Sequence, residues 1–225
     1  MRKKSKMIQR CLMVVGALSL VACATTKTDE LAGQESELLQ DKTLIYSIYR
    51  GAPDFHAITA KNAQFGLLGA GVAASSGNAI VERNHIENPA EEIAKQLANG
   101  LRDTRKVKVI SNHTITARSH ELTDIISLYG DYDYILDVHT FGWGTNYYPA
   151  DWNNYKVYIQ LEVRLIESKT KSILAEAYCY SAPEYEDPNL APSYEELEAG
   201  VRIKQELEKS VRYCVEHIRN ETKLY

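Results

Sequence analysis

Residues 156–180 decide the fold, and they read KVYIQLEVRLIE, then SKTKS, then ILAEAYCY. Apolar and polar side chains alternate through 156–167, which predicts an antiparallel strand with one face on a core and the other in solvent. Residues 168–172 supply polar turn residues, and 173–180 are again rich in strand-forming side chains. The stretch therefore predicts a β-hairpin that lays one apolar face on a hydrophobic core.

The segments on either side of the hairpin predict three more strands and three helices. Asn88 and Pro89 form a typical helix start, because an asparagine side chain can cap the first turn and proline fits its first position. Gly130 is typical of a helix end. The expected strands are 43–50, 106–111, 134–143, 156–167 and 173–180, and the expected helices begin at 88 and cover 120–129 and 195–221.

The order of these elements is β-α-β-α-β-β-β-α. It indicates an α+β fold in which a mixed, largely antiparallel sheet carries its helices on one face. Residues 43–225 are of a length that suits a single domain. Residues 23–42 are polar and have no apolar face, so we expect them to form a flexible tether before that domain.

Residues 63–77 read AQFGLLGAGVAASSG, and three interpretations of this small and apolar stretch remain open. Positions 69–74 fit the dinucleotide-binding pattern G-x-G-x-x-A, which requires a strand directly before it and a helix directly after it. Small residues four apart, such as Gly69 and Ala73, favour a close helix contact or a membrane-dipping segment. The interpretation that we prefer is a tightly packed helix or loop buried under the sheet.

The N-terminus has the layout of a bacterial secretion signal. Five basic residues fall within positions 1–10, and an uncharged apolar stretch follows from 11 to 22. That stretch is shorter than the roughly 20 residues that a membrane-spanning helix needs. Residues 20–23 read LVAC and resemble the bacterial lipobox, in which the signal is cut before the cysteine and the thiol is acylated. The resemblance implies that 1–22 is a signal peptide and that Cys23 carries lipid such as palmitate.

Lipidation at Cys23 implies that the folded domain is anchored to a membrane, because two or three acyl chains bind a bilayer stably. Residue 24 is alanine and not aspartate, which resembles the signal for transfer to the outer membrane. We therefore expect the protein on the periplasmic face of the outer membrane.

Charge argues against some classes of partner. Five of the 26 basic residues lie before Cys23, so the rest of the chain holds 21 basic and 30 acidic residues. This negative balance disfavours binding to nucleic acid and general attraction to anionic lipid, although it is compatible with a local basic patch. We expect no nucleic-acid partner.

Two cysteines remain after the signal, Cys179 and Cys214. The periplasm is oxidising, which favours a disulfide over two free thiols. Cys179 shares a face of its strand with apolar residues, and Cys214 shares the apolar face of the C-terminal helix, so both point toward one core. We therefore expect these two residues to form a disulfide, with two buried thiols as the alternative.

Seven aromatic residues fall within eighteen positions, around an expected loop that also holds several glycines and asparagines. Rigid aromatic rings beside adaptable polar groups are typical of binding surfaces. Three interpretations remain open: a protein interface, a glycan site whose rings stack on sugars, and a loop that folds its own rings over the sheet. The expected binding surface consists of Phe141, Trp143, Tyr147, Tyr148, Trp152, Tyr155 and Tyr158.

Patterns typical of catalysis or metal binding are weak. Asp137 and His139 lie two apart on one expected strand, so they face the same side and could seat a metal or orient a base. The sequence offers no third ligand, so we favour a hydrogen-bonded structural pair. The G-x-S-x-G and H-E-x-x-H motifs of hydrolases are absent from the sequence. We therefore expect no catalytic residue, no metal and no cofactor.

Two short motifs resemble a known family of envelope proteins. Residues 128–138 read LYGDYDYILDV, and 166–170 read IESKT at the following turn, with Lys171 where that family usually has glycine. These motifs resemble the αβ domain of the curli-secretion lipoprotein CsgG and the N-terminal domain of TolB, a domain also seen in lipoprotein activators of peptidoglycan synthases. The resemblance implies an adaptor or assembly role through protein contacts, and it brings no catalytic residues.

These features together favour a lipid-anchored protein that acts by binding and is not an enzyme. We expect an accessory or assembly factor of an outer-membrane or secretion complex, whose partner is an envelope protein, a second copy of the chain, or both. A lipoprotein that binds peptidoglycan or another glycan is the alternative.

Overall fold

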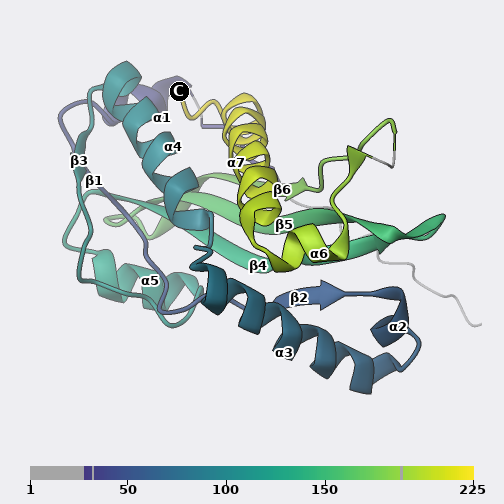
Figure 1. The fold of residues 1–225 in the computed structure, drawn as a ribbon. Helices are drawn as coiled ribbons and strands as arrows, with labels where there is room; N and C mark the ends of the chain where they lie inside the picture. Colours follow the sequence, from purple (N-terminus) through teal and green to yellow (C-terminus); the bar gives the residue numbers. More distant parts are fainter. Residues whose placement is uncertain (1–27, 32, 188–189) are drawn as a thin grey trace, which may run out of the picture.

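A mixed sheet forms the centre of the computed structural model, which describes residues 28–31, 33–187 and 190–225 (Figure 1). The strands within these residues are β1 (Thr43–Tyr46), β2 (Phe55–Ile58), β3 (Lys108–Ile110), β4 (Tyr134–Tyr148), β5 (Asp151–Glu167) and β6 (Ser172–Ser181). Five of them run in the order β3-β1-β4-β5-β6, and β2 extends the sheet by pairing with β4. β1 and β2 are parallel to β4, whereas β4, β5 and β6 are antiparallel neighbours. The predicted α+β class and mixed sheet are confirmed.

The predicted hairpin is present as β5 and β6, but the segment before it differs from the prediction. Residues 144–155, which we expected to form a loop, continue β4 and β5 instead, with Tyr147 opposite Tyr155. Aromatic and β-branched side chains favour extended strands because they pack well on a pleated surface. The loop is therefore reduced to a tight turn at Pro149 and Ala150.

A β-bulge in β4 changes which side chains face the core. Phe141 is the extra residue, because the register with β5 shifts between Thr140 and Gly142. His139 faces away from the main core, and in an uninterrupted strand residue 143 would face the same way. The extra residue reverses the alternation, so Trp143 lies in the main core.

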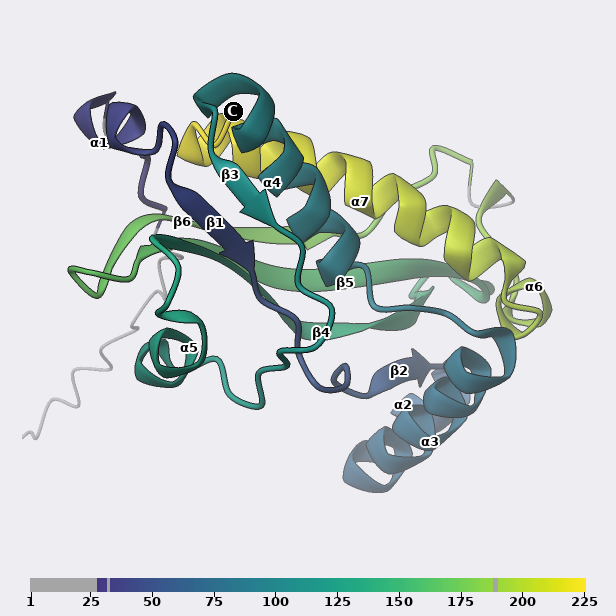
Figure 2. The same ribbon diagram turned by 90° about the vertical axis from the view of Figure 1, so that its left-hand side faces the viewer.

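Two long helices cover one face of the sheet and enclose the main core (Figure 2). They are α4 (Ala90–Arg105) and α7 (Val201–Thr222). A third helix, α5 (Leu122–Tyr129), packs against the opposite face, in a smaller core that includes Ile135 and Ile166. The prediction that helices share one face therefore holds for α4 and α7, and α5 departs from it because this end of the sheet is apolar on both faces.

The C-terminal helix is divided, although the apolar spacing predicted one helix over 195–221. A short helix, α6 (Tyr194–Glu198), begins at a Ser193 cap and ends just before Gly200. Gly200 has a φ of +81° and packs closely on Asn84, so that a Cβ atom would lie 2.3 Å from the Asn84 Cγ. Only glycine adopts this backbone conformation without strain, which explains why α7 starts as a separate helix here.

Residues 28–31 and 33–42 contact the folded domain, although we expected them to belong to a flexible tether. Asp29 forms an antiparallel bridge with Glu176 of β6, and Leu31 is buried in the main core. A short helix, α1 (Gly33–Leu38), follows, and Leu39 behind it is fully buried. Packing of these two leucines in the core holds this segment against the domain.

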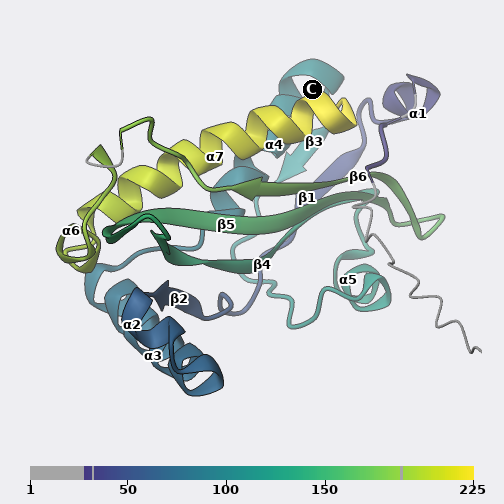
Figure 3. The ribbon, with the colours of Figure 1, turned by 90° about the vertical axis from the view of Figure 1, so that its right-hand side faces the viewer.

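The small and apolar stretch forms a helix outside the sheet and not a buried layer beneath it. A short helix, α2 (Ala60–Ala63), leads into α3 (Gly66–Asn84), which packs against β2 (Figure 3). Because a helix and not a strand precedes α3, the dinucleotide-binding interpretation is wrong. Among the residues that the structure describes, no helix combines the length and apolar character needed to cross a bilayer.

Candidate binding surfaces

A disulfide joins Cys179 of β6 to Cys214 of α7, with 5.7 Å between their Cα atoms, as the sequence predicted. Both residues are buried in the main core, on the face of the sheet that α7 covers. The signal peptide 1–22 and the lipidation residue Cys23 lie outside the described residues, so they remain predictions.

The aromatic residues expected to form one binding surface are divided between the core and the surface. Trp143 is only 2% exposed, and its indole Nε1 donates to the Pro53 carbonyl at 2.7 Å. Its ring meets Phe55 edge-on, with 5.0 Å between the centroids. Tyr155 is also buried. The prediction that Trp143 and Tyr155 belong to a binding surface is therefore wrong, because the bulge and the strand pairing turn both rings into the core.

The other members of that set lie in different surroundings. Trp152 is 61% exposed near the β4–β5 turn. Tyr148 lies under the Lys156 ammonium, 5.1 Å from its ring centroid, and Tyr147 packs partly against the main core. These three rings therefore do not form one continuous surface with the buried pair.

The middle of the sheet carries an aromatic surface on the side that α4 and α7 leave open. On that side α5 and α3 lie near opposite ends of the sheet, and no helix of the described chain covers the strands between them (Figures 2 and 3). Phe141 and Tyr180 are exposed, and the Phe141 ring stacks on Tyr178 at 6.0 Å. We call this surface the outer sheet face, and its aromatic members are Phe141, Tyr158, Tyr178 and Tyr180.

Sequence reasoning found Phe141 and Tyr158 but missed Tyr178 and Tyr180. The signal was present, because Cys179 was assigned to the core face of its strand. The residues on either side of it must then point to the opposite face of the sheet. The pairing of Tyr178 with Glu162 and of Tyr180 with Gln160 brings both tyrosines onto the outer sheet face.

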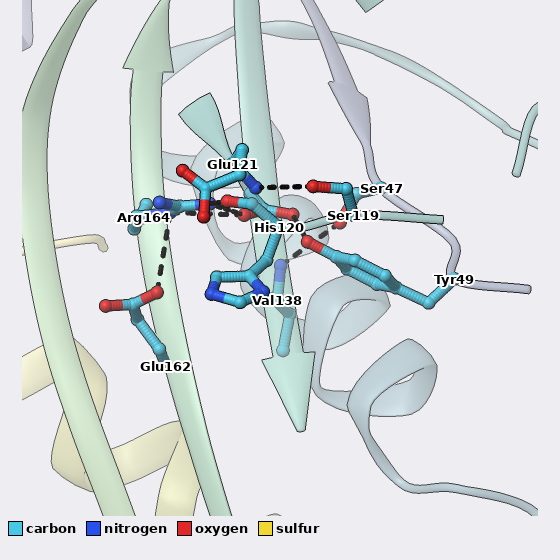
Figure 4. Close-up of polar contacts among 9 residues, drawn as sticks. Ser47, Tyr49, Ser119, His120, Glu121, Val138, Glu162 and Arg164 are labelled. Atoms are coloured by element: carbon cyan, nitrogen blue, oxygen red, sulfur yellow. Dashed lines mark hydrogen bonds and ion pairs between the residues drawn. The ribbon is translucent and has the colours of Figure 1, made fainter. Parts of the chain in front are cut away.

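A buried ion pair supports this face from β4 and β5. The Asp137 carboxylate accepts from Arg164 Nη2 at 2.6 Å and from the Tyr49 hydroxyl at 2.7 Å. Arg164 also donates to the His120 carbonyl at 2.6 Å and lies 3.6 Å from Glu162 (Figure 4). Burial, followed by the nearby Asp137 charge, raises the pKa of Tyr49, so its phenol stays protonated and donates.

The candidate pair Asp137 and His139 does face one side, but the two residues have different partners. Asp137 forms an ion pair with Arg164 and accepts a hydrogen bond from Tyr49, whereas the His139 ring stacks on His120 with 4.6 Å between centroids. In the part of the chain that the structure describes, no cluster of three or more histidine, cysteine or acidic residues could hold a metal. The expected hydrogen bond between Asp137 and His139 is therefore wrong: Asp137 is paired with Arg164 and Tyr49, and the His139 Nδ1 atom is buried without a hydrogen-bond partner among the described residues.

We expect acidification to destabilise the protein through His139. Burial, followed by the neighbouring His120, lowers the pKa of His139, so the folded state favours the neutral ring. The unfolded chain then binds the proton more readily, and stability that is full above about pH 6.5 is lost as the pH falls below it. Thermal unfolding at pH 7.5 and 5.5 should show a smaller loss for His139→Gln than for the wild type. Equal losses in the two proteins would contradict this assignment.

A second exposed surface lies on α3. Leu67 is 93% exposed and Leu68 is 81% exposed, and Phe65 and Val72 are also exposed beside them. We call these four residues the α3 apolar face. A groove of about 310 Å³ adjoins it, between Phe65 and Tyr194.

A wider groove of about 1240 Å³ lies between the loop after β1, the start of α4 and the middle of α7. Its rim carries charges of both signs, including Arg50, Glu91, Lys204 and Glu208. This mixture favours neither a cationic nor an anionic ligand.

Several solved structures resemble the fold at low sequence identity. The PelC dodecamer from Paraburkholderia phytofirmans aligns over 88% of this chain and 94% of its own, with 14% identity and a TM-score of 0.38. The LpoB C-terminal domain from Salmonella enterica aligns over 64% and 84%, with 13% identity and a TM-score of 0.30. Lipoprotein GNA1162 from Neisseria meningitidis aligns over 80% and 99%, with 12% identity and a TM-score of 0.26.

No protein-family model and no curated protein matches the chain. The structural neighbours include bacterial lipoproteins. Their TM-scores are too low to support a conclusion about activity or partner. The resemblance to CsgG and TolB stays a prediction.

Proposed function

We propose that this chain is a lipid-anchored protein of the bacterial envelope that binds a partner protein through the outer sheet face. The observation that carries the proposal is the aromatic surface on the uncovered middle of the sheet. A fold of sheet and helices usually buries its large apolar side chains, and an exposed aromatic group rimmed by polar residues is typical of a contact site. Phe141 and Tyr180 would be the anchors of that contact.

The chemistry beneath this surface favours binding over catalysis. Asp137 and Arg164 neutralise each other, and Tyr49 donates to the same carboxylate. Hydrogen bonding to Glu162, followed by burial, raises the pKa of Tyr178 to about 12, so its hydroxyl also stays protonated near neutral pH. Groups paired in this way hold the strands in place and are poorly suited to exchange protons with a substrate.

The proposal also includes where in the cell the protein is held. A lipid on Cys23 would hold the protein on a membrane, and alanine at position 24 favours the periplasmic face of the outer membrane. An accessory or assembly factor of an outer-membrane or secretion complex fits this combination of an anchor and a contact surface.

The proposal predicts that the double substitution Phe141→Ala and Tyr180→Ala abolishes partner capture while the fold survives. Both side chains are exposed, so their loss should remove contact area and leave the core intact. The measurement is in-cell cross-linking of the full-length protein, followed by purification and mass spectrometry. Tyr213→Ala is the matched control, because Tyr213 is an exposed tyrosine on α7.

One envelope protein that is captured at a stoichiometric level by the wild type and the control, and lost from the double variant, is the expected result. If all three proteins capture it equally, the outer sheet face is not the interface. Attached peptidoglycan fragments in place of a protein would favour the glycan-binding alternative.

A further inference from the structure

The N-terminal half of α3 turns large apolar side chains outward. Lys61 and Glu82 are the charged residues that bracket positions 62–81, and no charge lies between them. Within this stretch Leu67 and Leu68 are almost fully exposed, next to Phe65 and Val72. A cluster of this kind marks a surface that is covered by something in the working protein.

The small residues on one side of α3 are used in packing within the chain. Gly69, Ala73 and Gly77 are buried. A Cβ atom on Gly69 would lie 1.7 Å from the Asn62 carbonyl oxygen, and one on Gly77 would lie 1.8 Å from that of Phe55. This side of the helix is therefore occupied by α2 and β2. The outward side carries Leu67, Leu68 and Val72, with exposed small residues between them.

The predicted lipid lies a short chain length from the folded domain. Asp29 is bridged to Glu176 on β6, so the domain begins to hold the chain there. The five peptide units that join Cys23 to Thr28 span at most about 18 Å when fully extended. A lipid on Cys23, as in the proposed function on which this inference rests, would keep the domain against the bilayer.

We propose that the α3 apolar face inserts into the interfacial layer of the membrane that holds the lipid anchor. Leucine, valine and phenylalanine side chains are stabilised at the boundary between headgroups and acyl chains, and such segments lie in the membrane surface without spanning it. Lys61 is exposed at the same end of the helix, where its ammonium can meet lipid phosphate. Glu82 and Arg83 are exposed at the other end, so the N-terminal half is the part that enters.

Two attachments then fix the orientation of the domain. The sheet lies between α3 on one side and α4 and α7 on the other (Figures 2 and 3). Insertion of α3 turns α4 and α7 away from the bilayer and the outer sheet face toward it, so a partner bound at that face would lie at the membrane surface.

The test uses the full-length lipoprotein in vesicles of phosphatidylethanolamine and phosphatidylglycerol. Leu68→Cys carries an environment-sensitive fluorophore, and Tyr213→Cys is the control, because Tyr213 is 52% exposed on α7, which lies on the opposite side of the sheet from α3. Cys179 and Cys214 form a disulfide and Cys23 would carry the lipid, so the label goes to the introduced thiol. Brominated acyl chains serve as the quencher.

The expected result is blue-shifted emission and several-fold quenching at position 68, with water-like emission and little quenching at position 213. Water-like emission at 68 on vesicles that retain the protein overturns the insertion and leaves the lipid anchor in place. Shielding at 68 that resists brominated lipid and grows with protein density also overturns it, in favour of a second copy. Loss of the protein from the vesicles overturns the anchor and this inference together.

Discussion

Replacing Trp143 with alanine is expected to lower the free energy of unfolding by about 3–5 kcal/mol, the usual cost of removing a buried tryptophan. The substitution empties the space beside Phe55 and leaves the Pro53 carbonyl without its indole donor. Trp152→Ala should change the same free energy by less than about 0.5 kcal/mol, because the Trp152 ring lies at the surface.

Urea denaturation followed by circular dichroism measures both values. Similar losses for the two variants would show that the bulge does not place Trp143 in the core. The expected difference also decides how interaction data are interpreted: lost partner capture in Trp143→Ala would report unfolding, whereas in Trp152→Ala it would report a contact.

The second large effect is expected at the buried ion pair. Asp137→Ala should lower the free energy of unfolding by about 3–5 kcal/mol, because it leaves Arg164 charged, buried and without its closest partner. Arg164→Ala should have a similar effect, since it leaves the buried Asp137 carboxylate without its cationic partner. The double variant should cost clearly less than the sum of the two single variants, because each single change already removes the same interaction.

A double-mutant cycle by chemical denaturation provides the measurement. Strict additivity of the two single effects would mean that the 2.6 Å contact contributes no coupling. Lys42→Ala, which removes an exposed and longer contact of 3.9 Å to Asp133, is the control and should cost less than about 1 kcal/mol.

Local periodicity predicted much of the fold. The alternation in 156–167 identified β5 and its buried face, and the start signal at Asn88 and Pro89 identified α4. The same reasoning placed Cys179 and Cys214 toward one core, where the structure joins them. Each of these features depends on residues close together in sequence, so the pattern is visible without the tertiary structure.

The binding surface could not be predicted in the same way, because one inserted residue changes the phase of a strand. Counting by twos from His139 puts Phe141 and Trp143 on the same face. The bulge at Phe141 breaks that count and sends Trp143 to the opposite face. Gly142 is the one sequence signal of an irregularity here, but it does not identify the extra residue, because the register is set by pairing with β5.

The stretch 63–77 was ambiguous for a different reason. Nearly every side chain in it is small or apolar, so neither side of the helix is marked as the buried one. Contacts of Gly69 with Asn62 and of Gly77 with Phe55 decide which side packs inward, and these partners come from other elements. A sequence pattern with so few polar residues does not show which side of the helix faces solvent.

The disulfide bears on when the fold can be completed during export. On the route that the signal predicts, the chain crosses the inner membrane unfolded and reduced, and the thiols of β6 and α7 can pair only afterwards. Closing a loop with a sequence separation of 35 residues contributes roughly 4 kcal/mol in the chain-entropy model, a large part of the 5–15 kcal/mol typical of whole proteins. If the predicted signal directs export, the reduced precursor would be easier to keep unfolded for translocation, and α7 would be joined to the sheet only after export.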